Sequence, residues 1–319
     1  MQNEIMKATG TERKTVLFIS PHLDDVALSC SKSVSALRNQ GFDIFIVTLF
    51  STSDDPKQIG NRPWEKVSYE ERKREDVNAC KSLGASPLHM DFLDAPYRLE
   101  KFSKFNSLFL SSPQSYPTII KDLVSKISTV VNQYQPLKVF APLGIGWHID
   151  HLLTFEAVYS LKSNANFANI EFYFYEDRPY TFVSGATNLR FSELGLYPAN
   201  ESPYMLMTKF ILAIVHAYAW IFSRMGTAGQ VNILSMLWGF LLTLRRNLKF
   251  IRTRKNQVAL KLQLDGSVED LNFALAVSKL YASQFPYLFR DDKSFENLSL
   301  QYAQALSPNS AYSERMWII

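Results

Sequence analysis

A histidine and two aspartates stand close together near the start of the chain, in the run 21–25 (PHLDD), where they are His22, Asp24 and Asp25. Imidazole nitrogens and carboxylate oxygens are donors that a divalent cation such as Zn²⁺ accepts in proteins. Aspartates at such a position also commonly cap a helix. Taken alone, the run supports a metal site and a helix cap about equally.

A second run of the same kind follows much later in the chain, at 144–151 (GIGWHIDH), with His148, Asp150 and His151. The chain contains five histidines, and these two runs hold three of them. A lone histidine is more often a structural residue than a ligand, but two such runs together favour one composite site. The two remaining histidines, which we interpret as structural, are His89 and His216.

Both runs come directly after short apolar segments with the composition of buried strands, 15–20 (TVLFIS) and 138–142 (KVFAP). The first run is followed by a helical pattern at 26–40 and a second strand at 43–50, so the chain opens with a β-α-β unit. Such units form parallel sheets, whose ligands gather at the carboxyl ends of the strands. We therefore expect the two His/Asp runs to meet at one edge of a sheet.

The alternation of strands and helices continues to about residue 180. Further strands are predicted at 88–93 and 170–175, and further helices at 69–83, 118–134 and 151–161. The pattern predicts a three-layer, Rossmann-like α/β fold with a mostly parallel sheet and helices on both faces. We expect one domain over 1–319, interrupted by an apolar helical insertion at 181–260, with a single helix resuming at 268–285.

Ligand counting favours zinc at the expected site. A catalytic zinc ion keeps about three protein ligands and one open position for water, and His22, Asp25 and His151 would supply those ligands. Fe²⁺ or another divalent ion is the alternative. Such an ion lowers the pKa of water toward neutrality, and Asp24, which the ion does not need, could accept the proton.

The remaining polar residues of the second run complete a set that suffices for amide hydrolysis. As an imidazolium, His148 could stabilise the oxyanion or protonate the leaving amine, and Asp150 could hold His148 in the required tautomer. No serine or cysteine nucleophile is needed, and the sequence contains no GxSxG, HExxH or Walker A motif.

At these residues the chain resembles the PIG-L/LmbE-like family of zinc-dependent N-acetylglucosaminyl deacetylases. Its members carry an [AP]-H-P-D-D-E motif after the first strand and an H-x-x-H motif after a later one; here these read PHLDDV at 21–26 and HIDH at 148–151. Two weaker matches are YEDRPY at 175–180 and KLYASQ at 279–284. Within the first motif, leucine and valine replace the usual proline and glutamate, which weakens any transfer of substrate identity.

The resemblance implies a zinc-dependent hydrolase that removes an N-acetyl or other N-acyl group from an amino-sugar-containing substrate, either a small molecule or a lipid-linked sugar. It implies the metal ligands His22, Asp25 and His151. It also implies Asp24 as general base and His148 as the polarising histidine. Substrate contacts are expected from the loops 94–98 and 176–180. The candidates there are Tyr97, Arg98 and Arg178.

Two other functions would use the same residues. A metal phosphoesterase is one of them, but phosphoryl transfer often uses two metal ions, and ligands for about one are evident. A non-catalytic, Rossmann-like sugar-binding protein could keep a vestigial metal site, but it would have no use for the spare carboxylate of Asp24. We therefore favour the deacetylase.

The composition narrows the partners and the compartment. With 34 basic and 30 acidic residues, the net charge of +4 is too small to indicate a nucleic-acid partner. Two cysteines without a CxxC pair fit a reduced, cytoplasmic setting. The polar segment 1–13 shows no secretory signal.

An unusual stretch at 203–255 contains two apolar runs, 210–222 and 233–244, followed by a basic segment at 245–255. Apolar runs of this length are shorter than a membrane-spanning helix. We expect a buried helical hairpin here. The alternatives are a lid, a homo-oligomer face or a contact with the membrane surface, which would make the protein membrane-peripheral and would suit a lipid-linked substrate.

Overall fold

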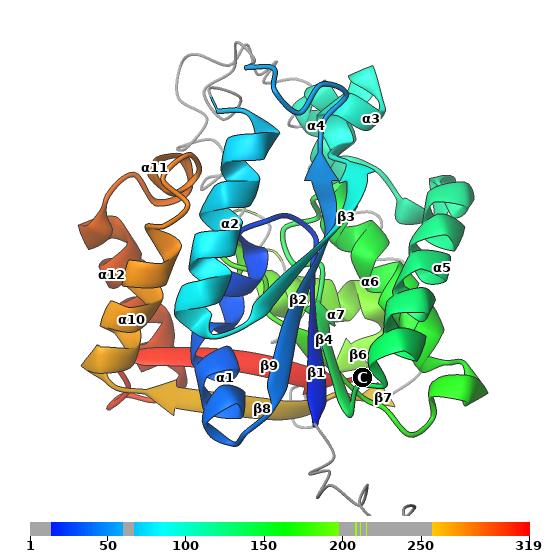
Figure 1. Cartoon of the computed structure of the whole chain (residues 1–319). Helices are drawn as coiled ribbons and strands as arrows, with labels where there is room; N and C mark the ends of the chain where they lie inside the picture. The colour runs from blue at the N-terminus through cyan, green and yellow to red at the C-terminus, as the bar shows by residue number, and fades with distance from the viewer. Residues whose placement is uncertain (1–13, 60–66, 198–207, 209–210, 212–214, 216–256) are drawn as a thin grey trace, which may run out of the picture.

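A seven-stranded sheet between two layers of helices forms the centre of the computed structural model, which describes residues 14–59, 67–197, 208, 211, 215 and 257–319 (Figure 1). The strand order is β3-β2-β1-β4-β5-β9-β8, and the first five strands of that order run parallel. The strands are β1 Thr15–Ser20, β2 Asp43–Thr52, β3 Ser86–Leu93, β4 Lys138–Pro142, β5 Glu171–Tyr175, β8 Leu260–Gly266 and β9 Tyr312–Ile318. The expected mostly parallel α/β sheet is confirmed.

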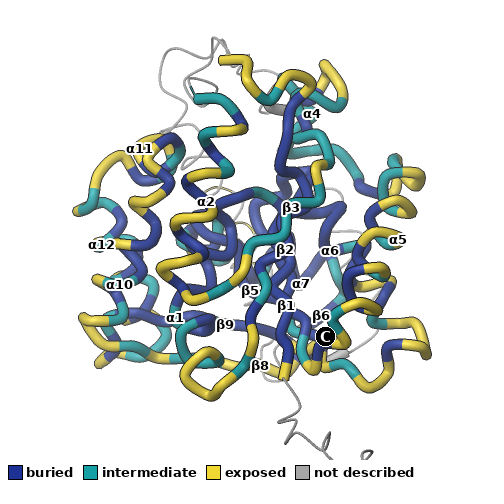
Figure 2. Tube along the Cα trace, in the orientation of Figure 1, coloured by how far each residue is buried: buried dark blue, intermediate teal, exposed yellow. Residues whose placement is uncertain are grey.

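The strand β1 shows why helices must cover both faces of this sheet. All six of its residues are buried, and the centre of the molecule is the most deeply buried part of the trace (Figure 2). Successive side chains of a strand point to opposite faces, so Leu17 and Ile19 enter one core cluster while Val16 and Phe18 enter the other. A strand that is apolar on both faces is typical of a covered parallel sheet.

The helices divide between these two cores (Figure 1). Helices α1 Asp25–Asn39, α2 Tyr69–Leu83 and α10 Val268–Ser278 cover one face. Helices α5 Pro117–Tyr134 and α6 Ile149–Lys162 cover the other. The site elements α1 and α6 therefore start from the same edge of the sheet and lie on opposite sides of it.

The C-terminal part differs from the sequence-based expectation. Strands β8 and β9 are not predicted, and β9 joins the sheet by antiparallel pairing with β5 and β8. The helix expected at 268–285 is present but shorter, because α10 ends at Ser278. Two further helices follow the turn after it, α11 Phe285–Phe289 and α12 Asp292–Leu306. Pro286 lies at the start of α11, where it cannot continue a preceding helix. The turn before it is fixed to α2, since Ser283 N–H donates to Glu75 at 2.8 Å.

The described ends of the expected insertion lie side by side. The first end contains the helix α7 Ala186–Leu194 and the strand β6 Leu196–Tyr197. The second end contains the strand β7 Gln257–Val258, which pairs in parallel with β6. The sequence predicts a helical segment over 181–260, but its described ends also contain the short strands β6 and β7. The hairpin expected at 203–255 and the structural role of His216 fall outside the described residues, except for the isolated positions 208, 211 and 215. No helix in the described ranges has the length and apolar character needed to cross a bilayer.

Candidate metal centre

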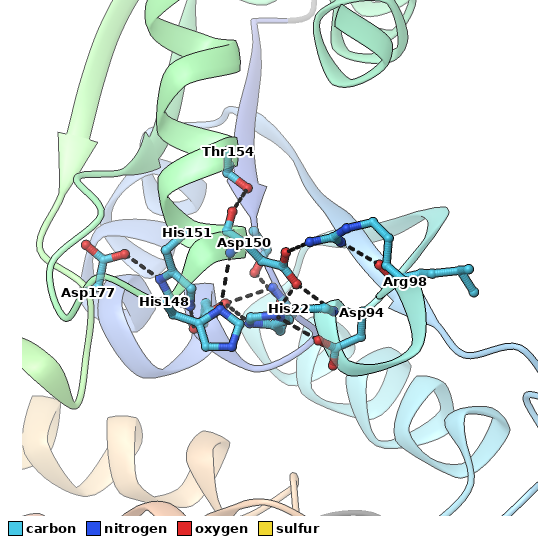
Figure 3. A network of polar contacts seen from close by, with 12 residues as sticks. His22, Asp94, Arg98, His148, Asp150, His151, Thr154 and Asp177 are labelled. Carbon is cyan, nitrogen blue, oxygen red and sulfur yellow. Dashed lines mark hydrogen bonds and ion pairs between the residues drawn. The ribbon is translucent and has the colours of Figure 1, made fainter. Parts of the chain in front are cut away.

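The two His/Asp runs lie beside one another, because the strands that precede them, β1 and β4, are neighbours in the sheet. One run links β1 to α1 and the other links β4 to α6. The ring centroids of His22, His148 and His151 are 4.8 to 5.4 Å apart, and Figure 3 shows the three rings gathered at one place. The structure thus brings together the residues that the sequence assigns to one site.

Asp25 lies between two of these histidines. Its carboxylate oxygens are 3.2 Å from His22 Nδ1 and 3.4 Å from His151 Nε2. Burial raises the pKa of Asp25, but the two imidazoles outweigh this effect and hold the pKa below its usual value. An ionised carboxylate between two imidazole nitrogens is a donor set that suits a divalent ion.

The far nitrogen of each of these imidazoles meets a buried carboxylate. His151 Nδ1 lies 2.7 Å from Asp177 Oδ1. His22 Nε2 lies 3.3 Å from Asp150 Oδ2 and 3.6 Å from Asp94 Oδ1. In metal sites, carboxylates in this position fix the tautomer and orientation of the ligand ring. The contacts leave His22 Nδ1 and His151 Nε2 directed at Asp25.

Asp177 is a residue of this cluster that the sequence analysis does not name. Besides contacting His151, it accepts the backbone N–H groups of Gly144 and Ile145, each at 2.9 Å. It therefore holds both the histidine and the loop that leads to it. A signal was available, because Asp177 follows the strong strand β5 within the YEDRPY run, at the same edge of the sheet.

Asp24 is placed as a spare acid rather than as a helix cap. It occupies the N-cap position of α1, but its side chain makes no capping hydrogen bond. The residue is buried, and burial together with the charge of Asp25 raises the pKa of Asp24 to about 6. The helix-cap interpretation of the first run therefore does not hold for Asp24.

His148 differs from the imidazolium that the sequence analysis expects. It is buried at the N-cap of α6, where its Nδ1 accepts the N–H of Asp150 at 3.3 Å. Burial and the positive charge on His22 lower the pKa of His148 to about 3. With Nδ1 as an acceptor, the neutral ring carries its proton on Nε2. The ring can still donate a hydrogen bond to a substrate oxygen, but it does so as a neutral group.

The sequence predicts that the carboxylate of Asp150 orients His148. In the structure, only the backbone N–H of Asp150 reaches that ring. The carboxylate lies on the other side, against His22, the backbone N–H of Ala95 and the guanidinium of Arg98 (Figure 3). The residue is fully buried. The reason is geometric: in the first turn of α6, the side chain leaves the helix toward the loop after β3.

The three residues expected to contact substrate have protein partners. The guanidinium of Arg98 donates to Asp150 and to the carbonyl of Leu93. Tyr97 is half-buried and meets the ring of Tyr69 edge-on, at 5.8 Å between centroids.

Arg178 lies in the protein interior. It is 2% exposed, its guanidinium lies 4.5 Å from the ring centroid of Tyr312, and it donates to the carbonyl of Ser313 in β9. The sequence predicts a substrate contact for this arginine. The structure instead gives it packing and hydrogen-bonding partners in the core.

Two groups of three donors among the described residues lie close enough to hold an ion. One comprises His22, His148 and His151, and the other His22, Asp94 and Asp150; in each group the donor atoms lie within 4.8 Å of one another. The second group is already engaged by Arg98 and by the backbone of Ala95. The residues present fit a divalent ion, and the ligand set of His22, Asp25 and His151 remains a prediction beside the three-histidine alternative.

Residues 17–162 match the family PIG-L, described as GlcNAc-PI de-N-acetylase. The matched region contains both His/Asp runs. The 2′-N-acetylparomamine deacetylase of Streptomyces fradiae is 28% identical over 171 residues, which cover 53% of this chain and 58% of that relative. Residues 17–162 of the chain are similar to the PIG-L/LmbE-like deacetylase family. The match to the relative thus spans little more than half of the relative's own length.

Two solved structures share the fold of this chain. The deacetylase of the A40926 pseudoaglycone superposes with a TM-score of 0.60 at 19% identity, covering 96% of this chain and 97% of that one. A deacetylase of the teicoplanin pathway superposes with a TM-score of 0.61 at 18% identity, covering 95% and 97%. At such identities the likeness establishes the fold, which extends well beyond the residues that the family match covers.

Proposed function

We propose that the protein is a metal-dependent amide hydrolase that removes an N-acetyl or other N-acyl group from an amino-sugar-containing substrate, with zinc as its metal. The family description and the name of the Streptomyces fradiae relative both concern de-N-acetylation of amino sugars. The structure adds a physical basis, because it provides a metal-binding donor set together with an acid and a hydrogen-bond donor beside it.

The observation that carries the proposal is the different state of two adjacent aspartates. Asp25 lies 3.2 and 3.4 Å from two imidazole nitrogens, which lower the pKa of its carboxyl group, while Asp24 is buried, makes no capping hydrogen bond and has a pKa raised to about 6. Two neighbouring carboxyl groups whose pKa values are pushed apart are typical of separate catalytic roles. Asp25 would bind the ion, and Asp24 would transfer the proton.

His22, Asp25 and His151 would hold the metal, which when bound polarises a carbonyl and activates water at neutral pH. Asp24 takes the proton from the attacking water and returns it to the leaving amine. His148 donates from Nε2 to the carbonyl oxygen as negative charge develops there. One water is consumed and the C–N bond is broken; the water's oxygen ends in the released carboxylate, and both of its protons end on the freed amine, which leaves as an ammonium group.

We further propose a small-molecule or lipid-linked amino sugar as the substrate and a cytoplasmic setting. N-acetylglucosamine conjugates are the first class to test, because they represent the family description most directly. Lipid-linked substrates would give a function to a membrane contact at 203–255.

The test combines metal analysis with acetate release. Purified protein loaded with zinc or iron would be offered free, nucleotide-linked and lipid-linked N-acetylglucosamine and N-acetylated aminoglycosides, with Asp24→Asn as the inactive control. Release of acetate in equal amount to free amine would support the proposal. A protein that binds the metal, hydrolyses no N-acyl amine and cleaves phosphate esters would be a metal phosphoesterase instead, and one that does neither would be a binding protein.

A further inference from the structure

The loop that follows β3 holds the buried carboxylate beside His22 at two points. The backbone N–H of Ala95 donates to Asp150 Oδ2 at 3.0 Å, and Arg98 Nη2 donates to Asp150 Oδ1. Both partners come from one short stretch, since Ala95 and Arg98 are the first and last residues of the helix α3 Ala95–Arg98. Figure 3 shows Arg98 reaching Asp150 from the side opposite to the histidines.

The two oxygens of Asp150 have different partners. Oδ1 receives the guanidinium, and Oδ2, which receives the Ala95 N–H, also lies 3.3 Å from His22 Nε2. Fixing Oδ1 therefore sets the direction in which Oδ2 faces the ring. The backbone behind this carboxylate is fixed as well, because Thr154 Oγ1 donates to the Asp150 carbonyl at 2.8 Å.

Arg98 is itself held in one orientation. Its Nη1 donates to the Leu93 carbonyl at 2.8 Å, and its guanidinium lies 4.7 Å from the ring centroid of Phe50. The side chain is only 13% exposed. An arginine with this many partners acts as a rigid fork rather than as a mobile cation at the surface.

We infer that Arg98 is a positioning residue that acts through Asp150 to fix the ring of His22, so that Nδ1 faces Asp25 and the metal. This inference rests on the metal-binding part of the proposed function and is independent of the substrate. It also replaces the substrate-binding role expected of Arg98 from the sequence, because both of its terminal nitrogens are already used by the protein.

The first test compares metal affinity with substrate affinity. Partners behind a metal ligand typically contribute about 10- to 100-fold in metal affinity or activity. We expect Arg98→Met to weaken zinc binding about 10- to 100-fold in a chelator competition, and to leave KM within about twofold once the metal is saturating. A substrate-holding arginine gives the opposite pattern, with KM raised and zinc affinity unchanged, and that pattern would overturn the inference.

Matched variants separate positioning from loss of charge or loss of fold. Arg98→Lys keeps the charge but offers a single point instead of a fork, so zinc affinity should fall between that of the wild type and that of Arg98→Met. Lys101→Met removes a cation from the same loop, where Lys101 lies over the rings of Phe102 and Tyr116, and should bind zinc as the wild type does. Equal weakening in Lys101→Met would show a general charge effect and would contradict the inference.

A double-mutant cycle addresses the route from Arg98 to the metal. If Arg98 acts through Asp150, then Arg98→Met should cost little additional zinc affinity in an Asp150→Asn background. The double variant removes both charges of the pair and so leaves no buried unpaired carboxylate; it should therefore fold even if Arg98→Met alone unfolds. Fully additive losses would mean that Arg98 acts by another route. Because zinc binding is the readout, the inference can stand even if no amide hydrolysis is ever detected.

Discussion

Three acidic residues around the histidine cluster have different pKa shifts, because their neighbours differ. Asp25 faces two imidazoles, and its pKa is lowered despite burial. Asp24 lies next to that charge and has its pKa raised to about 6. Burial also raises the pKa of Asp177, although its hydrogen bond to His151 acts in the other direction. Residue identity alone does not set these shifts; the balance between burial and the neighbouring charges does.

The role of Asp24 predicts a variant that binds the metal but does not turn over. Asp24→Asn keeps the side-chain volume and removes the proton acceptor, so kcat should fall by about 10²- to 10⁴-fold. Zinc affinity should change little, because the proposed ligands are His22, Asp25 and His151. Metal content by mass spectrometry and acetate release would be measured on the same sample. Loss of the metal in this variant would make Asp24 a ligand and would require another base.

The two histidines of the second run are expected to respond differently to alanine. His151→Ala should lose both zinc binding and activity, since its Nε2 faces Asp25. His148→Ala should retain zinc and lose about 10²- to 10³-fold in kcat, which is typical for removal of one oxyanion donor. Chelator competition on both variants distinguishes the ligand sets. If His148→Ala also loses zinc, the ion lies among the three histidines instead.

At the scale of elements, the side chain of Glu176, which lies just after β5, connects its own loop to the strand β9 and the helix α12. Its buried carboxylate receives the indole N–H of Trp317 at 2.9 Å and the guanidinium of Arg315 at 2.9 Å, both from β9. It also receives the hydroxyls of Tyr302 in α12 and Thr181. Burial raises the pKa of Glu176, but Arg315 and these hydrogen bonds leave it below the usual value. The carboxylate thus fixes the late strand to the strand that leads to Asp177.

Glu176→Gln should therefore destabilise the fold by about 3 kcal/mol at pH 7, because it leaves Arg315 without its buried partner. The sign with pH follows from the lowered pKa: the ionised form stabilises the fold above the usual glutamate pKa of about 4.3, and this contribution is lost as the pH falls. Urea unfolding from pH 7 to pH 3 should show the difference between wild type and variant shrinking on acidification.

An exposed pair on β5, the strand that precedes Glu176, provides the control. Glu171 in β5 pairs with Lys138 at the surface, and exposed pairs contribute about 0 to 1 kcal/mol. Glu171→Gln should therefore change the free energy of unfolding by less than about 1 kcal/mol. A loss as large as that of Glu176→Gln would mean that the buried network is not what holds β9.

For the whole molecule, the sequence predicts whatever depends on local pattern. The apolar runs that became β1 and β4, and the His/Asp runs behind them, could be located because strand ends of a parallel sheet share an edge. Strands β8 and β9 could not, because β9 pairs with β5 and β8 pairs with β9, and these partners are distant in sequence. The sequence also does not show which side chains contact one another. It places Asp150 beside His148, but in α6 the carboxylate of Asp150 faces His22 and Arg98.

The expected insertion leads to a prediction about the whole chain. Leu196 and Tyr197 pair with Gln257 and Val258, so the flanks of 198–256 are neighbours without it. We predict that replacing 198–256 by a Gly/Ser linker of about 12 residues, long enough to connect two parallel neighbouring strands, leaves a folded protein that binds zinc with wild-type affinity. Melting temperature and chelator competition would be compared with the full chain. An unfolded product would show that the segment belongs to the core, as a buried hairpin would.

The same pair of proteins tests the membrane contact. If 198–256 binds anionic lipid through apolar and basic residues, the full chain should co-sediment with anionic vesicles at low salt. This binding should weaken as added salt screens the charges. The shortened chain should stay in the supernatant. If neither protein sediments with the vesicles, 198–256 is no membrane contact, and a lid or an oligomer face is left. Light scattering on the two proteins then decides between these alternatives. Only loss of an oligomer face lowers the mass per particle by more than the mass of the deleted residues.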